Sequence, residues 1–581
     1  MEPLDCIDPE KIIPISRSTT KIFKTGTWSD RRPEYLEKTA PCRAACPTGN
    51  NIAQALHRAS QGDVDGALSA FLEENPLPGV CGSVCYRPCE IHCNRASWDG
   101  TVHIRALERA ASQWGIAKPS QLTEAGRKYS VAVVGSGPAG LSAAYHLARM
   151  GHPVTLIEAE DKLGGLLRWG IPPYRLPQDV LDRDLERMLT LDISVRTGIQ
   201  IDAGGFEEIR AKYHAVFIAI GAQKSKSLPI PGIQGDRVRL GFDFLKDVRR
   251  GTGKEIKGRV VVIGGGNVAI DTARTARRLG AENVEVVSLE GQDEMPAHKS
   301  EYHAAVEEGI TFQHGWGPKR ILEQRGHMVA VQFVRCTSVF DGKGEFQPSY
   351  DESTVTERDA DWVVLAIGQV ADLSFLEGSE ISANAASDAL PADSQTLETR
   401  LKSLFAGGDV LEGHGTVVDA VADGKRAALA IHMYSKGMPI KEEEEKVRLA
   451  GGPPFSIEAI FHAHRRWNPH SVVKFEDLEP LFLDQQPAAA LPRLDPAIRV
   501  TGFQEINQPL TSEQASIQAE RCLFCGTCTG CDRCFLYCPE LSIKPPRENQ
   551  DPYCADSDYC KGCAVCEAVC LRGVMSMGED K

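Results

Sequence analysis

The chain has 581 residues, of which 42% are hydrophobic, and it carries a formal net charge of −14. This length allows about three or four domains, and the acidic balance without a basic tract argues against a nucleic-acid surface. The N-terminal stretch lacks the apolar core of a signal peptide, and no apolar run is long enough to span a membrane. We therefore expect a cytoplasmic protein that binds neither nucleic acid nor membrane.

Most of the 19 cysteines lie in two groups near the ends of the chain. Without a secretion signal, so many cysteines indicate metal ligation rather than disulfides. The Cys-x3-Cys spacing of the first group places thiols about one helical turn apart, so that several converge on one centre. Zinc is the competing metal, but the prolines beside the cysteines and the dinucleotide motif that follows favour iron–sulfur. The first group comprises Cys42, Cys46, Cys81, Cys85, Cys89 and Cys93.

The region around this first group is expected to be helical. Residues 1–40 are poorly patterned and include TGTWSDRRP, which we expect to be an exposed arm. Amphipathic helices are expected over 51–73 and 101–115. We therefore predict a helical iron–sulfur domain over residues 1–128.

A dinucleotide-binding pattern covers Val131–Glu160. A β-branched strand leads into a GxGxxG turn, an alanine-rich helix and a second strand that ends at Glu158. The glycines admit a pyrophosphate to the helix N-terminus, and the terminal carboxylate can hold ribose hydroxyls. A glycine turn in an ordinary βαβ unit is the alternative. The expected cofactor contacts are Gly135, Gly137, Pro138, Ala139, Gly140 and Glu158.

The next segment, Gly164–Leu181, is dense in Gly and Pro. Its glycine pair would let the backbone approach a planar ring system closely, although a plain loop is the alternative. Here the candidate contacts are Gly165, Leu166, Arg168 and Arg175.

A second dinucleotide unit covers Arg259–Glu290. It repeats the strand, glycine turn, helix and strand, so the chain should bind two nucleotides, one held tightly and one exchanging. Its second strand ends in Ser288-Leu289-Glu290 without an arginine. A carboxylate there would repel a 2′-phosphate and accept from a 2′-hydroxyl, so we expect NAD(H), with a surface glutamate as the alternative. The candidate contacts are Gly264, Gly265, Gly266, Asn267, Val268, Glu290 and, in the later strand Asp361–Gln369, Gly368.

The stretch Leu404–Ile431 is expected to return to the first nucleotide domain as strand, turn and helix. A turn aspartate could bond a ribityl hydroxyl, and the helix dipole could stabilise negative charge on a reduced flavin ring. The candidate contacts are Gly408, Asp409, Thr416 and Val417. The expected division is a split FAD-binding domain over 129–248 and 366–436, an inserted NAD(H)-binding domain over 249–365, and a linker over 437–510.

The C-terminal region, 511–581, carries the most specific cysteine spacing. Two runs have the C-x2-C-x2-C-x3-C pattern of bacterial two-cluster ferredoxins, in which the fourth cysteine of each run ligates the other cluster. A zinc ribbon is the alternative. One 4Fe–4S centre is thus expected on Cys528, Cys531, Cys534 and Cys570. The other is expected on Cys538, Cys560, Cys563 and Cys566.

Over roughly residues 40–435 the chain resembles the family of the bacterial glutamate synthase small subunit, which includes the corresponding part of dihydropyrimidine dehydrogenase. The shared motifs are VGSGPAG, GGLLRWGIPPYRLP, GGGNVAIDTARTARRLGA, DEMPA and AGGDV. The resemblance implies an α/β fold with two Rossmann-like, glutathione-reductase-like domains. It also implies FAD at the first unit, a pyridine nucleotide at the second, and iron–sulfur clusters beside the flavin.

Two departures from this family are informative. Relatives that use NADPH carry arginines where Leu289 and Glu290 stand. Relatives also carry an RCLxC cysteine pair before the position of Cys42, which is absent here, whereas AERCLFC appears before the C-terminal ferredoxin run. We therefore expect one 4Fe–4S cluster on Cys42, Cys93, Cys522 and Cys525. A second would lie on Cys46, Cys85 and Cys89, with Glu108 as a fourth ligand carried over from the family. The competing frame makes Cys522, Cys525 and Cys528 ligands of the ferredoxin run itself.

The expected function is an NADH:acceptor oxidoreductase, with hydride passing to FAD and single electrons passing through the clusters to a partner redox protein, in either direction. No catalytic side chain is needed beyond the cofactors. The fused ferredoxin makes the chain similar to iron–sulfur flavoproteins associated with reverse dissimilatory sulfite reductase. Subunits of 2-oxoacid:acceptor oxidoreductases or of glutamate synthase, and a redox-inactive assembly subunit, are the alternatives. A homodimer is one candidate assembly.

Overall fold

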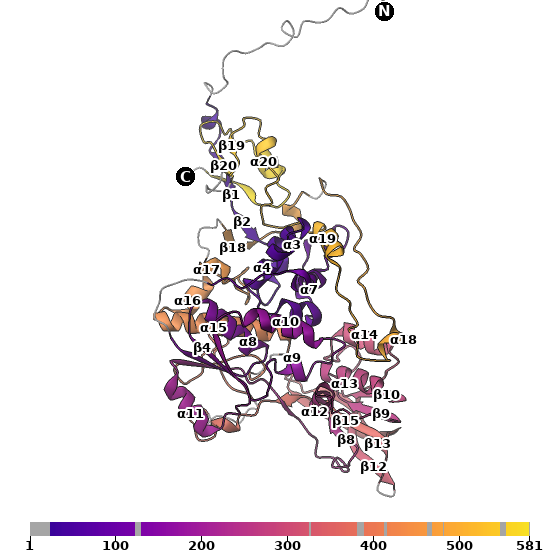
Figure 1. Ribbon diagram of the computed structural model, residues 1–581. Helices are drawn as coiled ribbons and strands as arrows, with labels where there is room; N and C mark the ends of the chain where they lie inside the picture. Colours follow the sequence, from indigo (N-terminus) through magenta and orange to yellow (C-terminus); the bar gives the residue numbers. More distant parts are fainter. Residues whose placement is uncertain are drawn as a thin grey trace, which may run out of the picture.

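The computed structural model describes residues 24–121, 129–324, 327–379, 381, 389–411, 415–461, 467–479, 482–546 and 553–579. Two nucleotide-type sheets form the lower part of the molecule, helices cover the region above them, and a small cysteine-rich module stands at the top (Figure 1). None of the helices in these ranges combines the length and hydropathy needed to cross a bilayer.

The first sheet has five parallel strands in the order β17-β6-β3-β4-β5. They are β17 (Leu404–Ala406), β6 (Ala215–Ile218), β3 (Val131–Val134), β4 (Val154–Ile157) and β5 (Ile193–Arg196). The three inner strands and the edge strand β17 are buried on both faces, which explains their apolar sequences. Residues 131–134 and 404–406, far apart in sequence, thereby share one sheet.

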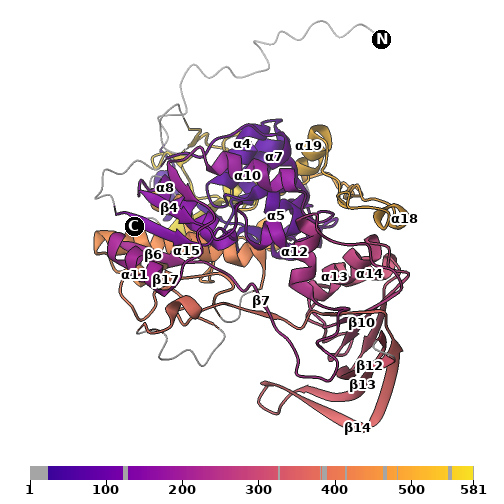
Figure 2. The same ribbon diagram turned by 60° about the horizontal axis from the view of Figure 1, so that its bottom comes forward.

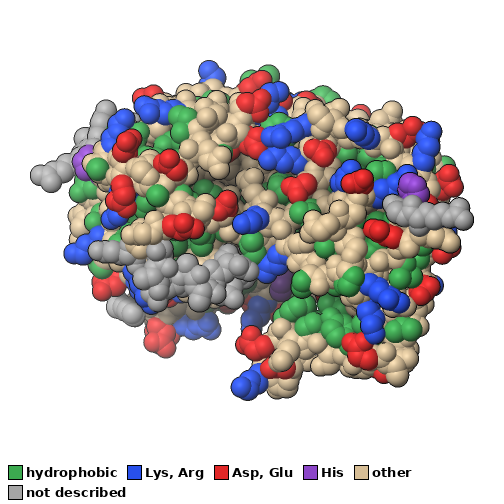
Figure 3. Space-filling view, turned by 90° about the horizontal axis from the view of Figure 1, so that it is seen from below, with side chains coloured by type: hydrophobic (Ala, Val, Ile, Leu, Met, Phe, Trp, Pro, Cys, Tyr) green, Lys and Arg blue, Asp and Glu red, His purple; other side chains and the backbone are tan. Residues whose placement is uncertain are grey.

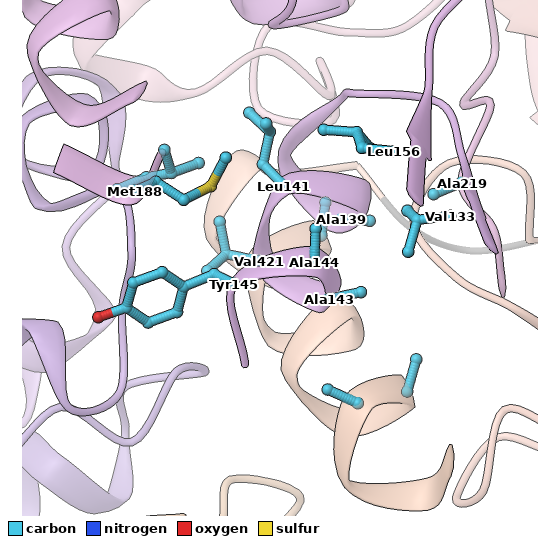
Figure 4. Close-up of a cluster of buried hydrophobic side chains, with 14 of the residues drawn as sticks. Val133, Ala139, Leu141, Ala143, Ala144, Tyr145, Leu156, Met188, Ala219 and Val421 are labelled. Atoms are coloured by element: carbon cyan, nitrogen blue, oxygen red, sulfur yellow. The ribbon is translucent and has the colours of Figure 1, made fainter. Parts of the chain in front are cut away.

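Two helices pack against this sheet and against each other, α8 (Pro138–Arg149) and α15 (Val417–Lys436). Small residues permit the close approach, because a Cβ at Gly424 would lie 2.0 Å from the carbonyl oxygen of Ala139. Leu141 and Tyr145 of α8 and Val421 of α15 lie in one buried cluster with the sheet residues (Figure 4). Burial of each large apolar side chain of this kind contributes about 1.5–3 kcal/mol. The other helices around this sheet are α9 (Leu166–Trp169), α10 (Gln178–Met188), α11 (Ala203–Lys212) and η4 (Ser374–Leu376).

The second sheet is also parallel, in the order β11-β10-β9-β15-β8. Its strands are β11 (Thr311–His314), β10 (Asn283–Ser288), β9 (Arg259–Ile263), β15 (Trp362–Leu365) and β8 (Val238–Leu240), with helices α12 (Gly241–Arg249), α13 (Asn267–Arg278) and α14 (Lys299–Glu307). Because β8 and α12 join this core, the unit begins ahead of the start expected at residue 249.

A three-stranded antiparallel sheet extends from the second unit (Figure 2). It comprises β12 (Trp316–Gln324), β13 (His327–Phe340) and β14 (Phe346–Asp359). The two units are joined by a short antiparallel pair, β7 (Lys224–Ser225) and β16 (Gln369–Val370). Seen from below, side chains of both charges are interspersed over the two units (Figure 3).

The N-terminal helices form a separate core that also contains a C-terminal helix, α19 (Ser512–Glu520). The helices expected over 51–73 and 101–115 are present, and the side chains of Asn51 and Asp63 cap the N-termini of two of them. The elements are α2 (Pro41–Ala44), α3 (Ile52–Ser60), α4 (Val64–Leu72), α5 (Pro78–Val84), α6 (Pro88–Ile91), η3 (Asn94–Ser97) and α7 (Ile104–Trp114).

The segment 437–510, expected as a linker, has structure of its own. It buries Leu449, Phe455 and Val473, and its strand β18 (Trp467–Val472) pairs in parallel with β2 (Glu37–Thr39). Residues 484–510 then run down to the second nucleotide unit, where Arg499 Nη1 contacts Glu307 of α14 at 2.6 Å. The other elements are α16 (Ile440–Glu445), α17 (Glu458–Phe461), η6 (Phe475–Asp477) and α18 (Pro496–Arg499).

The cysteine-rich module at the top combines both ends of the chain (Figure 1). Residues expected as an exposed arm form η2 (Gly26–Trp28) and β1 (Arg31–Tyr35), and β1 pairs antiparallel with β21 (Met575–Glu579). Pairing satisfies backbone groups that β21 would otherwise expose as a free edge, which sequence periodicity cannot reveal. The module also contains the pair β19 (Ile543–Lys544) and β20 (Cys554–Ala555), and the helices α20 (Arg533–Leu536) and α21 (Val565–Ala568).

Candidate functional site

The main cavity, about 520 Å³ in volume, lies where the two nucleotide units meet; we call it the flavin cavity. This position, at the carboxyl ends of parallel strands, is the usual ligand site of such sheets. Fourteen of the twenty-one predicted nucleotide contacts line it: Gly135, Gly137, Pro138, Ala139, Glu158, Gly165, Leu166, Arg175, Asn267, Val268, Gly408, Asp409, Thr416 and Val417.

The first glycine turn has the geometry that a dinucleotide requires. Gly135 has φ +99°, and a Cβ there would lie 2.4 Å from the Ala219 carbonyl oxygen. Gly140 lies just behind the cavity, where a Cβ would lie 1.9 Å from the Gly135 oxygen. The Glu158 carboxylate accepts hydrogen bonds from the backbone N–H groups of Ser136 and Glu160, each at 2.8 Å. These contacts hold the carboxylate beside the turn, where it can reach a ribose.

The N-terminus of α15 closes another side of the flavin cavity. Thr416 caps the helix by accepting from Asp419 N at 3.2 Å, and Gly408 N donates to Asp423 Oδ2 at 2.9 Å. The first-turn N–H groups of this twenty-residue helix therefore face a site lined by Thr416 and Val417. Such a helix end favours negative charge on a bound group.

The two predicted arginines differ. Arg168 lies outside the flavin cavity, because its Nε donates to Leu163 O at 2.6 Å and its Nη2 pairs with Asp182. These contacts connect Leu163 to Asp182 within the loop. Arg175 lines the cavity and contacts Asp271 Oδ2 at 2.6 Å.

Several residues at this junction were missed by the sequence interpretation. Asp271 of α13 lines the flavin cavity, and burial raises its pKa to about 6 despite Arg175. Arg175 Nη2 also donates to the hydroxyl of Tyr86 at 3.2 Å. The Tyr86 ring stacks on His298 with 4.1 Å between ring centroids. The only sequence feature that could have indicated a role for Tyr86 is its position directly after Cys85. The contacts themselves join segments that are far apart in the sequence and could not be predicted from it.

The second glycine turn lies beside the cavity. Gly264 has φ +140°, and a Cβ there would lie 2.2 Å from the Ala366 oxygen. Gly265 and Gly266 follow it, and a Cβ at Gly265 would lie 2.5 Å from Glu290 Oε2, so this carboxylate lies directly against the turn. Gly368, φ +111°, accepts from Lys226 N at 3.0 Å next to the β7–β16 pair and lies outside the cavity.

The cysteines surround small cavities in sets. Among the described residues, no group of three or more His, Cys, Asp or Glu side chains is arranged to hold a single metal ion. One small cavity, lined otherwise by apolar residues and Asn94 and Arg95, contains Cys42, Cys93, Cys522 and Cys525, which we call the fold-back set. Burial and the neighbouring thiols raise the pKa of Cys42, and burial raises that of Cys525 to about 12. Such thiols stay neutral unless a metal displaces their protons.

A second group of cysteines lies near the buried carboxylate of Glu108. Glu108 is 6% exposed, and its Oε1 accepts from Asn50 Nδ2 at 3.0 Å and Asn75 Nδ2 at 2.9 Å. Burial raises the pKa of Glu108 to about 8. Glu108 lies near the thiols of Cys46 and Cys85, and these two lie near Cys89. We call Cys46, Cys85, Cys89 and Glu108 the inner set. Cys81 is a further neighbour of Glu108, to which the sequence interpretation assigned no role.

Two more cavities lie in the top module. The middle set, Cys528, Cys531, Cys534 and Cys570, lines one of them. The outer set, Cys538, Cys560, Cys563 and Cys566, lines the other. The fourth cysteine of each run thus faces the cavity of the other run, as the ferredoxin spacing predicts. Cys528 faces a different cavity from Cys522 and Cys525, in contrast to the competing frame.

Family models match the N-terminal helical domain and the two nucleotide units. The pyridine nucleotide-disulphide oxidoreductase family model matches residues 129–424, and the model of dihydropyrimidine dehydrogenase domain II, 4Fe-4S cluster, matches residues 36–119. The chain is 33% identical to the NADP(+)-dependent formate dehydrogenase subunit beta of Moorella thermoacetica, over 73% of this chain and 66% of that protein.

Two further relatives use differently named nucleotides. The NADPH-Fe(3+) oxidoreductase subunit beta of Geobacter sulfurreducens is 32% identical, over 78% of this chain and 74% of its own length. The NAD-dependent dihydropyrimidine dehydrogenase subunit PreT of Escherichia coli is 33% identical, over 68% of this chain and 92% of its own. The chain therefore belongs to the pyridine nucleotide-disulphide oxidoreductase family and is an NAD(P)H-dependent iron–sulfur flavoprotein oxidoreductase.

Proposed function

We propose that the protein is an NADH:acceptor oxidoreductase that passes electrons between FAD and a partner redox protein through four 4Fe–4S clusters. The observation that carries this proposal is the grouping of twelve cysteines around three separate small cavities, together with an inner set whose Cys85 lies between two residues of the flavin-cavity lining, Val84 and Tyr86.

FAD fits the flavin cavity by the chemistry of its lining. The glycine turn at Gly135 and Gly137 offers backbone N–H groups to a pyrophosphate, and Glu158 accepts from ribose hydroxyls. Asp409 lies where a ribityl hydroxyl would need an acceptor, and the α15 N-terminus at Thr416 favours a negatively charged ring. When bound, FAD supplies the ability to take up a hydride and to release electrons singly. The protein's part is to bind, orient and exclude water.

Selectivity for NADH over NADPH is assigned to Glu290. Its carboxylate lies against Gly265, at the end of β10, where the 2′ position of an adenosine ribose is held in such units. A carboxylate there accepts from a 2′-hydroxyl and repels a 2′-phosphate. The relatives include both NAD-named and NADP-named proteins, so this residue is the part of the proposal most open to a direct test.

The cysteine sets have the donor chemistry of 4Fe–4S sites, with Glu108 as the one carboxylate ligand. Bound clusters supply one-electron storage. The chain connects the sets closely: Cys85 lies between Val84 and Tyr86, which line the flavin cavity, and Cys525 and Cys528 are three positions apart. The proposed sequence is flavin cavity, inner set, fold-back set, middle set and outer set.

The partner would dock at the top module, where Cys531 and Cys563 are exposed. The relatives' names describe them as subunits, which supports a stable or transient partner protein for this chain. Dissimilatory sulfite reductase remains a candidate on the resemblance in sequence alone. Electron flow can run in either direction, because cluster potentials depend on their surroundings.

Anaerobically purified protein tests the proposal. Full loading corresponds to about 16 iron atoms per chain, four for each cluster, together with one FAD. Addition of NADH should bleach the flavin absorbance and then produce reduced-cluster EPR signals. Intact FAD and iron without bleaching by either NADH or NADPH would favour a redox-inactive assembly subunit instead.

A further inference from the structure

A buried arginine lies between two of the cysteine sets. Arg572 lies two positions after Cys570, in the loop that leads into β21, and 9% of the surface of this residue is exposed to solvent. Its Nη1 donates to Leu523 O at 2.7 Å, and its guanidinium lies 4.9 Å from the centre of the Phe524 ring. Leu523 lines the cavity of the fold-back set, and Arg572 itself lines the cavity of the middle set.

This guanidinium has no carboxylate partner within ion-pair distance among the residues that the structure describes. Its Nε is buried and has no hydrogen-bond acceptor. A buried, uncompensated charge of this kind costs several kcal/mol, so proteins retain one where negative charge lies nearby. The negative groups that face Arg572 are thiols of both sets, Cys522 and Cys525 on one side and Cys531 and Cys570 on the other.

We propose that Arg572 is the shared counter-charge of the clusters on the fold-back and middle sets, and that it raises the reduction potentials of both. The inference rests on the proposed function, since it requires clusters on these two sets. Four thiolates give a 4Fe–4S centre a net negative charge, which increases on reduction. A cation held between two such centres in a site shielded from water therefore favours the reduced form of each.

The arrangement has a functional consequence. Because one charge acts on both centres, it shifts both potentials in the same direction and leaves the difference between them little changed. Arg572 is thus a positioning residue that acts through the clusters rather than a catalytic one.

Glu37 provides a contrast of opposite sign. Its Oε1 accepts from Cys528 N at 3.1 Å, and the residue is 6% exposed. This carboxylate lies beside Cys528 of the middle set. Replacement of Glu37 by Gln should therefore raise one potential, whereas replacement of Arg572 should lower two.

The experiment is an EPR-monitored redox titration of the full-length holoprotein and of Arg572→Gln, Arg572→Lys and Glu37→Gln. In Arg572→Gln we expect two of the four reduction potentials to fall by about 59 mV each, which corresponds to a tenfold change in the equilibrium constant of a one-electron reduction. Arg572→Lys should retain most of the wild-type values. The control is Lys561→Gln, because Lys561 lies near Cys563 but is paired with Glu540 at 2.8 Å and is partly exposed.

Two outcomes overturn the inference. One is unchanged potentials in Arg572→Gln with all iron retained. The other outcome concerns iron loss in Arg572→Gln, in which case the lysine variant decides. If Arg572→Lys, which keeps the positive charge, loses the same clusters or shows a fall of both potentials, a charge effect is excluded. Failure of the proposed function is distinguishable, because wild-type protein would then lack the cluster signals themselves.

Discussion

Asn94 donates a hydrogen bond from its Nδ2 to the Sγ of Cys525 at 3.5 Å, although 431 positions separate the two residues. Asn94 directly follows Cys93, so this contact joins the last N-terminal cysteine to the C-terminal AERCLFC motif. The C-terminal segment thereby supplies half of a four-cysteine site whose other half lies in the N-terminal helical domain.

Removal of the two returning cysteines tests that site. The Cys522→Ala/Cys525→Ala double variant should lose about four iron atoms per chain, because two of four ligands disappear from one cluster. FAD content should not change, since neither residue lines the flavin cavity. Cys554→Ala is the matched control, because Cys554 is exposed and lines none of the cysteine cavities. Iron retention in the double variant would contradict the fold-back ligation.

The N-terminal strand should be essential to the top module. Tyr35 lines the middle cavity and Pro33 the outer one, and β1 covers the edge of β21. Deletion of residues 1–39 should therefore remove about eight iron atoms while FAD binding persists. Deletion of residues 1–23 leaves every described contact of β1 and β2 intact and serves as control. If the longer deletion keeps full iron content, the strand is dispensable.

Nucleotide selectivity should depend on Glu290. In Glu290→Arg a cation replaces the carboxylate beside Gly265, so the ratio of kcat/KM for NADH to that for NADPH should fall at least about tenfold, or 1.4 kcal/mol. Glu294→Gln is a suitable comparison, since Glu294 is exposed and accepts from Gly291 N at 3.2 Å. A wild-type preference for NADPH would refute the assignment before any variant is made.

The Arg175–Asp271 pair should make activity dependent on pH. With a pKa of about 6, Asp271 is ionised and paired above pH 6 and is neutral below it. We expect kcat/KM for NADH to fall by about fivefold, or about 1 kcal/mol, as the pH decreases through 6. Asp271→Asn should resemble the low-pH wild type at every pH.

Steady-state rates between pH 5 and pH 8 provide the measurement for this pair. Asp236→Asn is the control, because Asp236 is exposed and lies away from the flavin cavity. An inflection near pH 6 that persists unchanged in Asp271→Asn would assign it to another group.

Short-range patterns predicted the elements that form the nucleotide sites. The valine run at Val131 and the glycines at Gly135 and Gly264 are local requirements of strands and tight turns, so they can be read without the fold. Arg168 was expected to contact the cofactor but does not line the flavin cavity, because a loop sequence does not reveal which way a side chain turns. The segment 437–510 was expected to be a linker, because its short apolar groups have no regular period and their burial depends on distant partners.

Local sequence patterns were enough to predict the chemistry: two glycine turns are each followed by an acid, and the cysteine spacings predict how the thiols of the two C-terminal runs divide between two centres. The connections between distant segments are visible only in the folded chain. Folding brought Cys522 and Cys525 to Cys42 and Cys93, paired β1 with β21, and left Arg572 buried between two cysteine sets. Backbone and turn preferences act over a few residues, so a short stretch of sequence is enough to predict them. Burial and charge compensation depend on groups hundreds of positions away, so they cannot be predicted from local sequence.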